Sequence, residues 1–243
     1  MRDRFINGIV LTRIVLDCSS VEDAIKSMGK LFGLSPDDLR KTVGRWEIDR
    51  LCNLPSPTAI RWFHATRAPV GFTFEEGLLP TSEALPKLWE SLGAVAAKWT
   101  SPAKWKEYRR SFECSDRFFP QQFRRKQIAP EWEGPFAFLV RDAALRRYDV
   151  HKDFTKICET LEDICADYED VFAHPLRGAY EAATRPCLVT FTQPGDWPGA
   201  VRAALHYVRR AIDGIEQDLK SNTNFNGKGA AVPRSSIDFV EWL

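Results

Sequence analysis

Long apolar runs, a large net charge and a targeting segment are all missing from this sequence of 243 residues, and each absence excludes a class of protein. The longest apolar runs, residues 8–11 and 136–140, are far shorter than the roughly 20 residues that a helix needs to cross a bilayer. The formal net charge is only +1, so the chain as a whole has no general attraction to nucleic acid or to a membrane surface. The charged N-terminus leads into no apolar region with a small-residue cleavage site, which predicts a cytoplasmic protein with no membrane association.

The six cysteines are scattered, and none belongs to a Cys-x-x-Cys motif. In a chain without a secretion signal, this scatter predicts reduced and mostly buried thiols. His151, Cys158 and Cys165 recur every seven residues and would share one face of a helix. Neighbours in that row would lie about 10.5 Å apart along the helix axis. This is too far for a single zinc ion with bonds of roughly 2.0–2.3 Å, so we predict no metal site.

Phosphate-binding Gly-rich loops, Ser nucleophile elbows and internal repeats are missing as well. What is present is the composition of an ordinary globular protein, with 44% apolar and 28% charged residues. The length fits one large domain, or one domain with a small appendage.

The pattern of elements predicts an α+β fold. Residues 8–17 are rich in β-branched side chains and predict a strand. Apolar spacing then predicts two helices, the first capped by Ser19 or Ser20 and the second by Ser35. Pro55 and Pro57 separate these elements from the rest, so we expect an N-terminal strand–helix–helix appendage (residues 1–55) and a main domain (residues 58–243).

Within the main domain, helical periodicity covers residues 82–98, 102–112 and 152–172, and a further helix is predicted to start near Asp196 and Pro198. Short apolar runs predict strands over residues 136–140, 187–191 and 236–241, and the Asn- and Gly-rich residues 221–229 predict a flexible loop.

The most informative stretch is residues 61–67, Arg-Trp-Phe-His-Ala-Thr-Arg, followed ten residues later by Gly-Leu-Leu-Pro at residues 77–80. A strand here would deliver the imidazole of His64, the hydroxyl of Thr66 and the guanidinium of Arg67 to one edge of a cleft. Such groups suit a ligand that carries phosphates and ribose hydroxyls, and the planar fork of Arg67 can bind a pyrophosphate bidentately. A histidine at the end of a strand can also be purely structural.

This stretch resembles the first motif of the ADP-ribosyltransferase superfamily, in which an aromatic residue, His, a small residue and Thr precede a short helix and a Gly-Leu turn. The resemblance implies a split mixed or antiparallel sheet around bound NAD, with surrounding helices. It also implies that His64 and Thr66 hold the ribose and nicotinamide of NAD, and that Gly77 begins the turn. Residues 134–141 are similar to a strand of that family, and residues 232–237 to its closing Val-Pro turn and last strand.

One part of the family pattern is missing. A transferase of this kind usually has a Glu shortly before the Val-Pro turn, which holds a ribose hydroxyl and stabilises positive charge as nicotinamide leaves, but residues 222–231 contain no acid. Glu241 on the last strand is the first substitute to consider, with Glu216 on the preceding helix another. Otherwise the chain binds a nucleotide without this chemistry, or it resembles the RNA 2′-phosphotransferase branch, whose site relies on Arg and His. The second aromatic residue of the site can be Tyr108, Tyr148 or Tyr180.

Residues 98–126 form a basic segment with nine Lys or Arg against three acids, a local net charge of +6, and aromatic residues interleaved among them. Basic groups attract phosphates and aromatic rings stack on bases, so this segment predicts nucleic-acid binding at Arg124, Arg125 and Lys126. The aromatic spacing of three and four equally fits a buried helical stripe with solvated charges opposite.

We therefore expect a NAD-dependent ADP-ribosyltransferase that modifies a protein or a nucleic acid. The expected NAD contacts are His64, Thr66, Arg67 and Gly77, with His64 and Glu241 as catalytic candidates. Intracellular enzymes of this kind are often toxins or defence effectors. The alternative is a non-catalytic nucleotide- or nucleic-acid-binding protein that uses the same residues.

Overall fold

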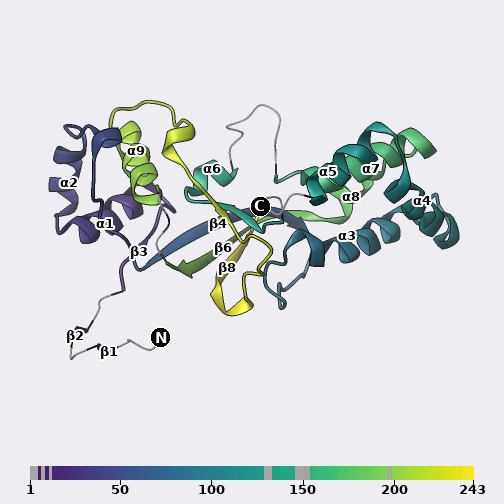
Figure 1. The fold of residues 1–243 in the computed structure, drawn as a ribbon, viewed down its shortest axis with the longest axis horizontal. Coiled ribbons are helices and arrows are strands. Elements are labelled where there is room, and N and C mark those ends of the chain that lie inside the picture. Colours follow the sequence, from purple (N-terminus) through teal and green to yellow (C-terminus); the bar gives the residue numbers. More distant parts are fainter. Residues whose placement is uncertain are drawn as a thin grey trace. The chain divides into compact units, whose positions relative to one another are not determined.

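The chain folds into two compact units that interleave along the sequence (Figure 1). The computed structural model describes residues 5–6, 9–10, 13–128, 133–145, 154–195, 197 and 199–243. The first unit comprises residues 1–64, 137–150 and 190–225, and the second comprises residues 65–136, 151–189 and 226–243. The sequence predicted a single boundary at residues 55–58, whereas each unit combines three separate segments. In the described part of the chain, no helix is both long enough and apolar enough to span a bilayer.

The strands show that the protein is α+β. The sheet has the strand order β7-β5-β4-β6-β8, with β3 beside β4. Its members are β3 (Val15–Leu16), β4 (Ala59–Ala68), β5 (Phe136–Phe138), β6 (Arg185–Pro194), β7 (Asn224–Asn226) and β8 (Ile237–Trp242). β4 runs antiparallel to β5, with Phe63 opposite Phe138, and parallel to β3, so the sheet is mixed.

The expected strand over residues 8–17 is divided. Its described parts are β2 (Ile9–Val10), which pairs with β1 (Phe5–Ile6), and β3. Residues 8, 11 and 12 lie outside the described residues.

Three helices of the first unit lie together in Figure 1: α1 (Val21–Phe32), α2 (Pro36–Val43) and α9 (Ala200–Ile212). The predicted starts of α1 and α2 are confirmed, because the Ser20 and Ser35 side chains each accept a hydrogen bond from a backbone N–H three residues later. α9 packs against α1 and α2, and Val201, Leu205 and Val208 of α9 are buried. Residues 196 and 198, where this helix was predicted to start, lie outside the described residues. A shorter helix, α6 (Arg141–Leu145), follows β5.

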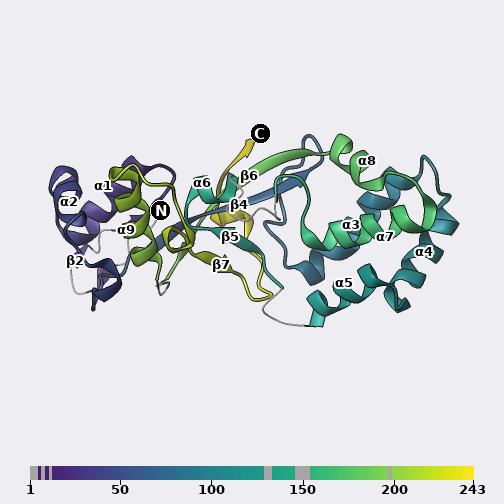
Figure 2. The same ribbon diagram turned by 90° about the horizontal axis from the view of Figure 1, so that it is seen from above.

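The helices of the second unit lie together in Figure 2. They share an aromatic core. They are α3 (Thr81–Ala96), α4 (Pro102–Cys114), α5 (Phe118–Ile128), α7 (Glu159–Phe172) and α8 (Leu176–Ala183). Trp89, Phe112 and Tyr168 are almost fully buried there, and the hydroxyl of Tyr108 donates to the carbonyl of Ile164 at 2.9 Å. This confirms the interpretation of the aromatic residues in α4 as a buried stripe.

Two parts of the main domain differ from the sequence prediction. The helix predicted from residue 152 begins at Glu159, because residues 154–156 form a turn, and residues 152–153 lie outside the described residues. The tail predicted as a flexible loop contains β7, since Phe225 is buried against Trp62 and Trp197. The last strand, predicted over residues 236–241, is confirmed as β8.

Candidate functional site

β4 presents His64 and Thr66 on the same face. Side chains alternate between the two faces of a strand, so residues 60, 62, 64, 66 and 68 share one side. On that side Ile60, Trp62 and Ala68 are buried, whereas His64 and Thr66 are half-buried. An imidazole and a hydroxyl two residues apart therefore form a polar interruption in an apolar strand face.

Arg67 points to the opposite face of β4, where it holds the end of α8. Its Nε donates to the Thr184 hydroxyl at 3.0 Å, and one Nη donates to the carbonyls of Glu181 and Thr184 at 2.6 and 2.7 Å. The other Nη donates to the carbonyl of Thr155 at 2.8 Å. Four of the five N–H donors of the guanidinium are thus engaged within the second unit. Arg67 thus does not share the strand face of His64 and Thr66, because side chains alternate along β4, and its contact with NAD stays a prediction.

The Gly77-Leu78 turn lies directly against Val232. Leu78 and Val232 exchange both backbone hydrogen bonds at 2.9 Å. Gly77 has a φ of +81°, and a Cβ atom built on it would lie 2.0 Å from the carbonyl oxygen of Val232. Only glycine fits at position 77. The Gly-Leu turn and the Val-Pro turn, which the resemblance singled out, therefore form one backbone pair although they lie 155 residues apart in sequence.

The carboxylates predicted from the sequence lie in different surroundings. Glu241 is half-buried on β8, the strand at the edge of the sheet, and the neighbouring end of that strand is tied by the Leu243 N–H donating to Pro186 O at 3.0 Å. Glu216 is exposed and follows the end of α9 rather than lying on it. That Glu241 supplies the acid stays a prediction.

Two of the tyrosines predicted for the site are core residues of the second unit. Tyr108 is 3% exposed and Tyr180 is 4% exposed. Burial raises the pKa of both phenols well above the ordinary value. Tyr148 lies outside the described residues. Burial leaves little of Tyr108 or Tyr180 for stacking on a ligand.

Much of the charge in the basic segment is used within the second unit. Arg117 forms a bidentate pair with the buried Asp167, with two contacts of 2.7 Å. Lys126 donates to Asp163 at 2.7 Å, and Arg124 donates to the carbonyls of residues 113 and 115. Of the three residues predicted to bind nucleic acid, Arg125 is the exposed one.

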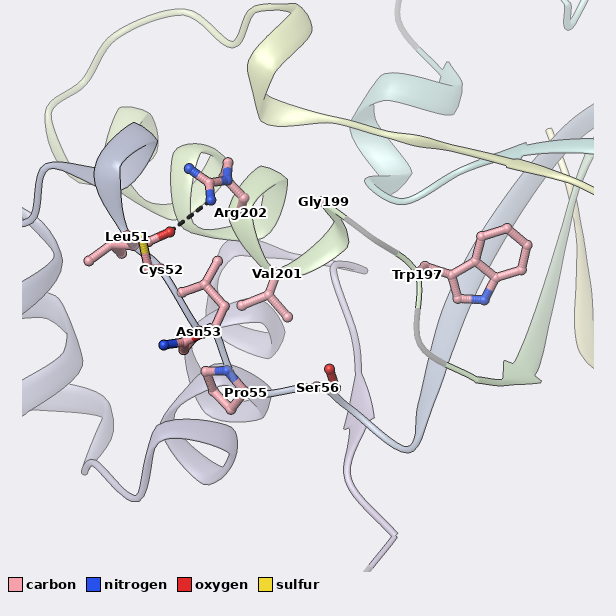
Figure 3. A pocket seen from close by; sticks show the side chains of 10 residues that line it. Leu51, Cys52, Asn53, Pro55, Ser56, Trp197, Gly199, Val201 and Arg202 are labelled. Carbon is pink, nitrogen blue, oxygen red and sulfur yellow. Dashed lines mark hydrogen bonds between the residues drawn. The ribbon is translucent and has the colours of Figure 1, made fainter.

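Two cavities lie in the first unit, and none of the predicted site residues lines them. One, of about 350 Å³, is bounded by residues 51–56 and the start of α9 (Figure 3). Arg202 spans its edge and donates to the carbonyl of Leu51 at 2.8 Å, while the Trp197 indole points away from Cys52 and Arg202. The other, of about 680 Å³, is lined by residues 44–50 and by charged side chains of α9 and residues 213–220. Those charges are largely paired, as in the His206–Asp49 contact of 3.0 Å and the Lys220–Asp49 contact of 2.8 Å.

The thiols divide into buried and exposed groups. Cys18, Cys165 and Cys187 are buried, Cys158 is half-buried, and Cys52 and Cys114 are exposed. Burial raises the pKa of the Cys187 thiol to about 11, so it is protonated at neutral pH. Within the described ranges, no three His, Cys, Asp or Glu side chains are grouped so that they could hold a metal ion, and His151 lies outside those ranges.

No family model, curated protein or solved structure matches this chain. Two local features therefore bear on function. These are the polar pair on β4 and the Gly77-Leu78 turn against Val232.

Proposed function

We propose that the protein is a NAD-dependent ADP-ribosyltransferase. The observation that carries this proposal is the backbone pair between Leu78 and Val232. Two short patterns that resemble separate family motifs form this pair. Their contact supports treating them as parts of one site, with the family's split sheet as the corresponding fold.

In this proposal His64 and Thr66 orient NAD from one face of β4. The imidazole and the hydroxyl provide hydrogen-bonding groups for ribose and for the nicotinamide amide. Loss of nicotinamide leaves positive charge on the ribose, and a fixed carboxylate nearby would stabilise that charge electrostatically. Arg67 is left out of the NAD contacts, because its guanidinium already holds α8.

The binding step is tested by calorimetry with NAD. We expect His64→Ala to weaken binding at least tenfold, because the substitution removes a polar contact from the accessible part of the strand face. His206→Ala is the matched control, since that imidazole lies on α9 against Asp49 and should leave NAD affinity unchanged. Equal affinity in wild type and His64→Ala would remove His64 from the site.

The chemical step is tested by assaying NAD consumption with protein and nucleic-acid acceptors. Wild type should release nicotinamide. The rate of NAD consumption by His64→Ala should be about 10²-fold lower than that of wild type, which is the scale expected when an electrostatic or positioning contact is lost. The prediction that Glu241 is catalytic requires a similar loss in Glu241→Gln, and full activity in that variant would eliminate the residue. The absence of nicotinamide release by wild type with every acceptor would leave only the non-catalytic binding alternative.

A further inference from the structure

Residues 222–231 contain no acidic residue, but in the folded chain the carboxylate of Glu133 lies against them. The turn at residues 227–230 is anchored by two backbone hydrogen bonds, from Gly227 N–H to Pro135 O at 3.0 Å and from Gly229 N–H to Gly134 O at 3.1 Å. A Cβ atom built on Gly229 would lie 3.0 Å from Oε2 of Glu133. A carboxylate from a distant part of the chain therefore packs directly against the turn that precedes Val232.

Glu133 is held in place from the start of α3. Its carbonyl accepts from the Thr81 N–H at 2.8 Å, and its Oε2 accepts from the Ser82 hydroxyl at 3.3 Å. The residue is half-buried, so its position is restrained while its surface is partly open to a ligand. The Ser82 bond engages one of the two carboxylate oxygens.

Glu133 lies just before β5, the strand that pairs with β4. β5 begins three residues after Glu133 and runs antiparallel to β4. The start of β5 is therefore directed toward the end of β4, which carries Thr66. Thr66, Gly77, Glu133 and Val232 all belong to the second unit.

We propose that Glu133 supplies the carboxylate for the ADP-ribosyltransferase reaction, in place of the acid that residues 222–231 lack. This inference rests on the proposed function. The Glu133 carboxylate accepts a hydrogen bond from a ribose hydroxyl of NAD and lies near the ribose as positive charge develops there. The bond between ribose C1′ and the nicotinamide nitrogen breaks, and its electron pair leaves with nicotinamide, which becomes neutral. The acceptor nucleophile forms the new bond to C1′ and releases its proton to solvent.

The test measures NAD affinity and NAD turnover separately in Glu133→Gln. An amide keeps an oxygen that can accept from Ser82 but carries no negative charge, so we expect turnover to fall about 10²-fold or more with little change in NAD affinity. Glu83→Gln is the matched control, because Glu83 is an exposed carboxylate in the first turn of α3, next to Ser82. Its turnover should equal that of wild type.

The outcomes separate the two proposals. Turnover by wild type with undiminished turnover by Glu133→Gln overturns the role of Glu133 and leaves the proposed function intact. No turnover by wild type overturns both. If Glu133→Gln does not fold, Glu133→Asp replaces it, since shortening the side chain keeps the charge and withdraws it from the site. A loss of kcat in that variant at unchanged NAD affinity supports the proposal, and unchanged kcat contradicts it.

Discussion

Gly77 illustrates how a single backbone conformation determines which segments can meet. Its φ of +81° lies in the left-handed region, and the carbonyl of Val232 occupies the space where a Cβ atom would be. The conformational restriction alone costs a side-chain-bearing residue about 1 kcal/mol, and an unavoidable clash with backbone adds about 1–3 kcal/mol. The close approach of the two turns therefore depends on the missing side chain.

We predict that Gly77→Ala lowers the free energy of unfolding by about 3 kcal/mol, because it adds both a strained backbone and a clash with Val232. Gly71→Ala is the matched control, because Gly71 has a similar φ of +86° but no atom within 4 Å of its Cβ position. It should cost only about 1 kcal/mol. Denaturant titration of both variants measures the difference, and equal losses would show that the contact with Val232 is not close in solution.

At the scale of elements, Arg67 joins a strand to the end of a helix. Its hydrogen bonds reach the carbonyls of residues 155, 181 and 184 and the Thr184 hydroxyl. The last carbonyls of a helix have no partner within the helix, so a guanidinium is well suited to satisfy them. The residue that the sequence offered as a phosphate ligand thus serves to position α8 against β4.

We predict that Arg67→Lys lowers the free energy of unfolding by about 2–3 kcal/mol, because an ammonium group cannot replace the planar set of bonds and each bond contributes about 1 kcal/mol. NAD affinity should stay at the wild-type value. Arg185→Lys is the control, since exposed Arg185 makes one long contact of 3.4 Å with the Leu243 carbonyl, and its effect should stay within about 0.5 kcal/mol. A large loss of NAD affinity in Arg67→Lys without loss of stability would return Arg67 to the nucleotide site.

At the scale of the whole molecule, the first unit cannot be separated at the prolines. α9 depends on residues before Pro55: Arg202 donates to the carbonyls of Ile48 and Asp49 at 2.9 and 2.7 Å, and Arg209 donates to that of Trp46 at 2.8 Å. The buried face of α9 packs against α1 and α2. The segment predicted as an appendage is therefore part of the core of the first unit.

We accordingly predict that a fragment of residues 58–243 loses α9 or aggregates, because it would expose Val201, Leu205 and Val208, each worth about 1.5–3 kcal/mol when buried. Circular dichroism and hydrogen exchange on the fragment and on the full chain measure the loss. A soluble fragment with native protection in residues 200–212 would support the predicted boundary instead.

Features that depend on neighbours a few residues apart follow from the amino-acid sequence alone. Ser20, Ser35 and Ser101 each cap a helix through a bond to a backbone N–H three residues later. Alternation and apolar spacing likewise located β6, β8 and most of α3 and α4. The polar pair on β4 and the Gly-Leu turn were also visible, because each occupies only a few consecutive residues.

Features that depend on distant partners are set by the folded chain and cannot be predicted from short stretches of sequence. The face on which Arg67 lies follows from the register of β4, and its partners are about 90 to 120 residues away. Phe225 forms a strand within a polar tail because it packs on Trp62. No local pattern points to Glu133, because its place beside Gly229 depends on a contact between residues nearly 100 positions apart. Local propensity cannot encode such contacts, since their free energy comes from burial and hydrogen bonds between segments that meet only in the folded chain.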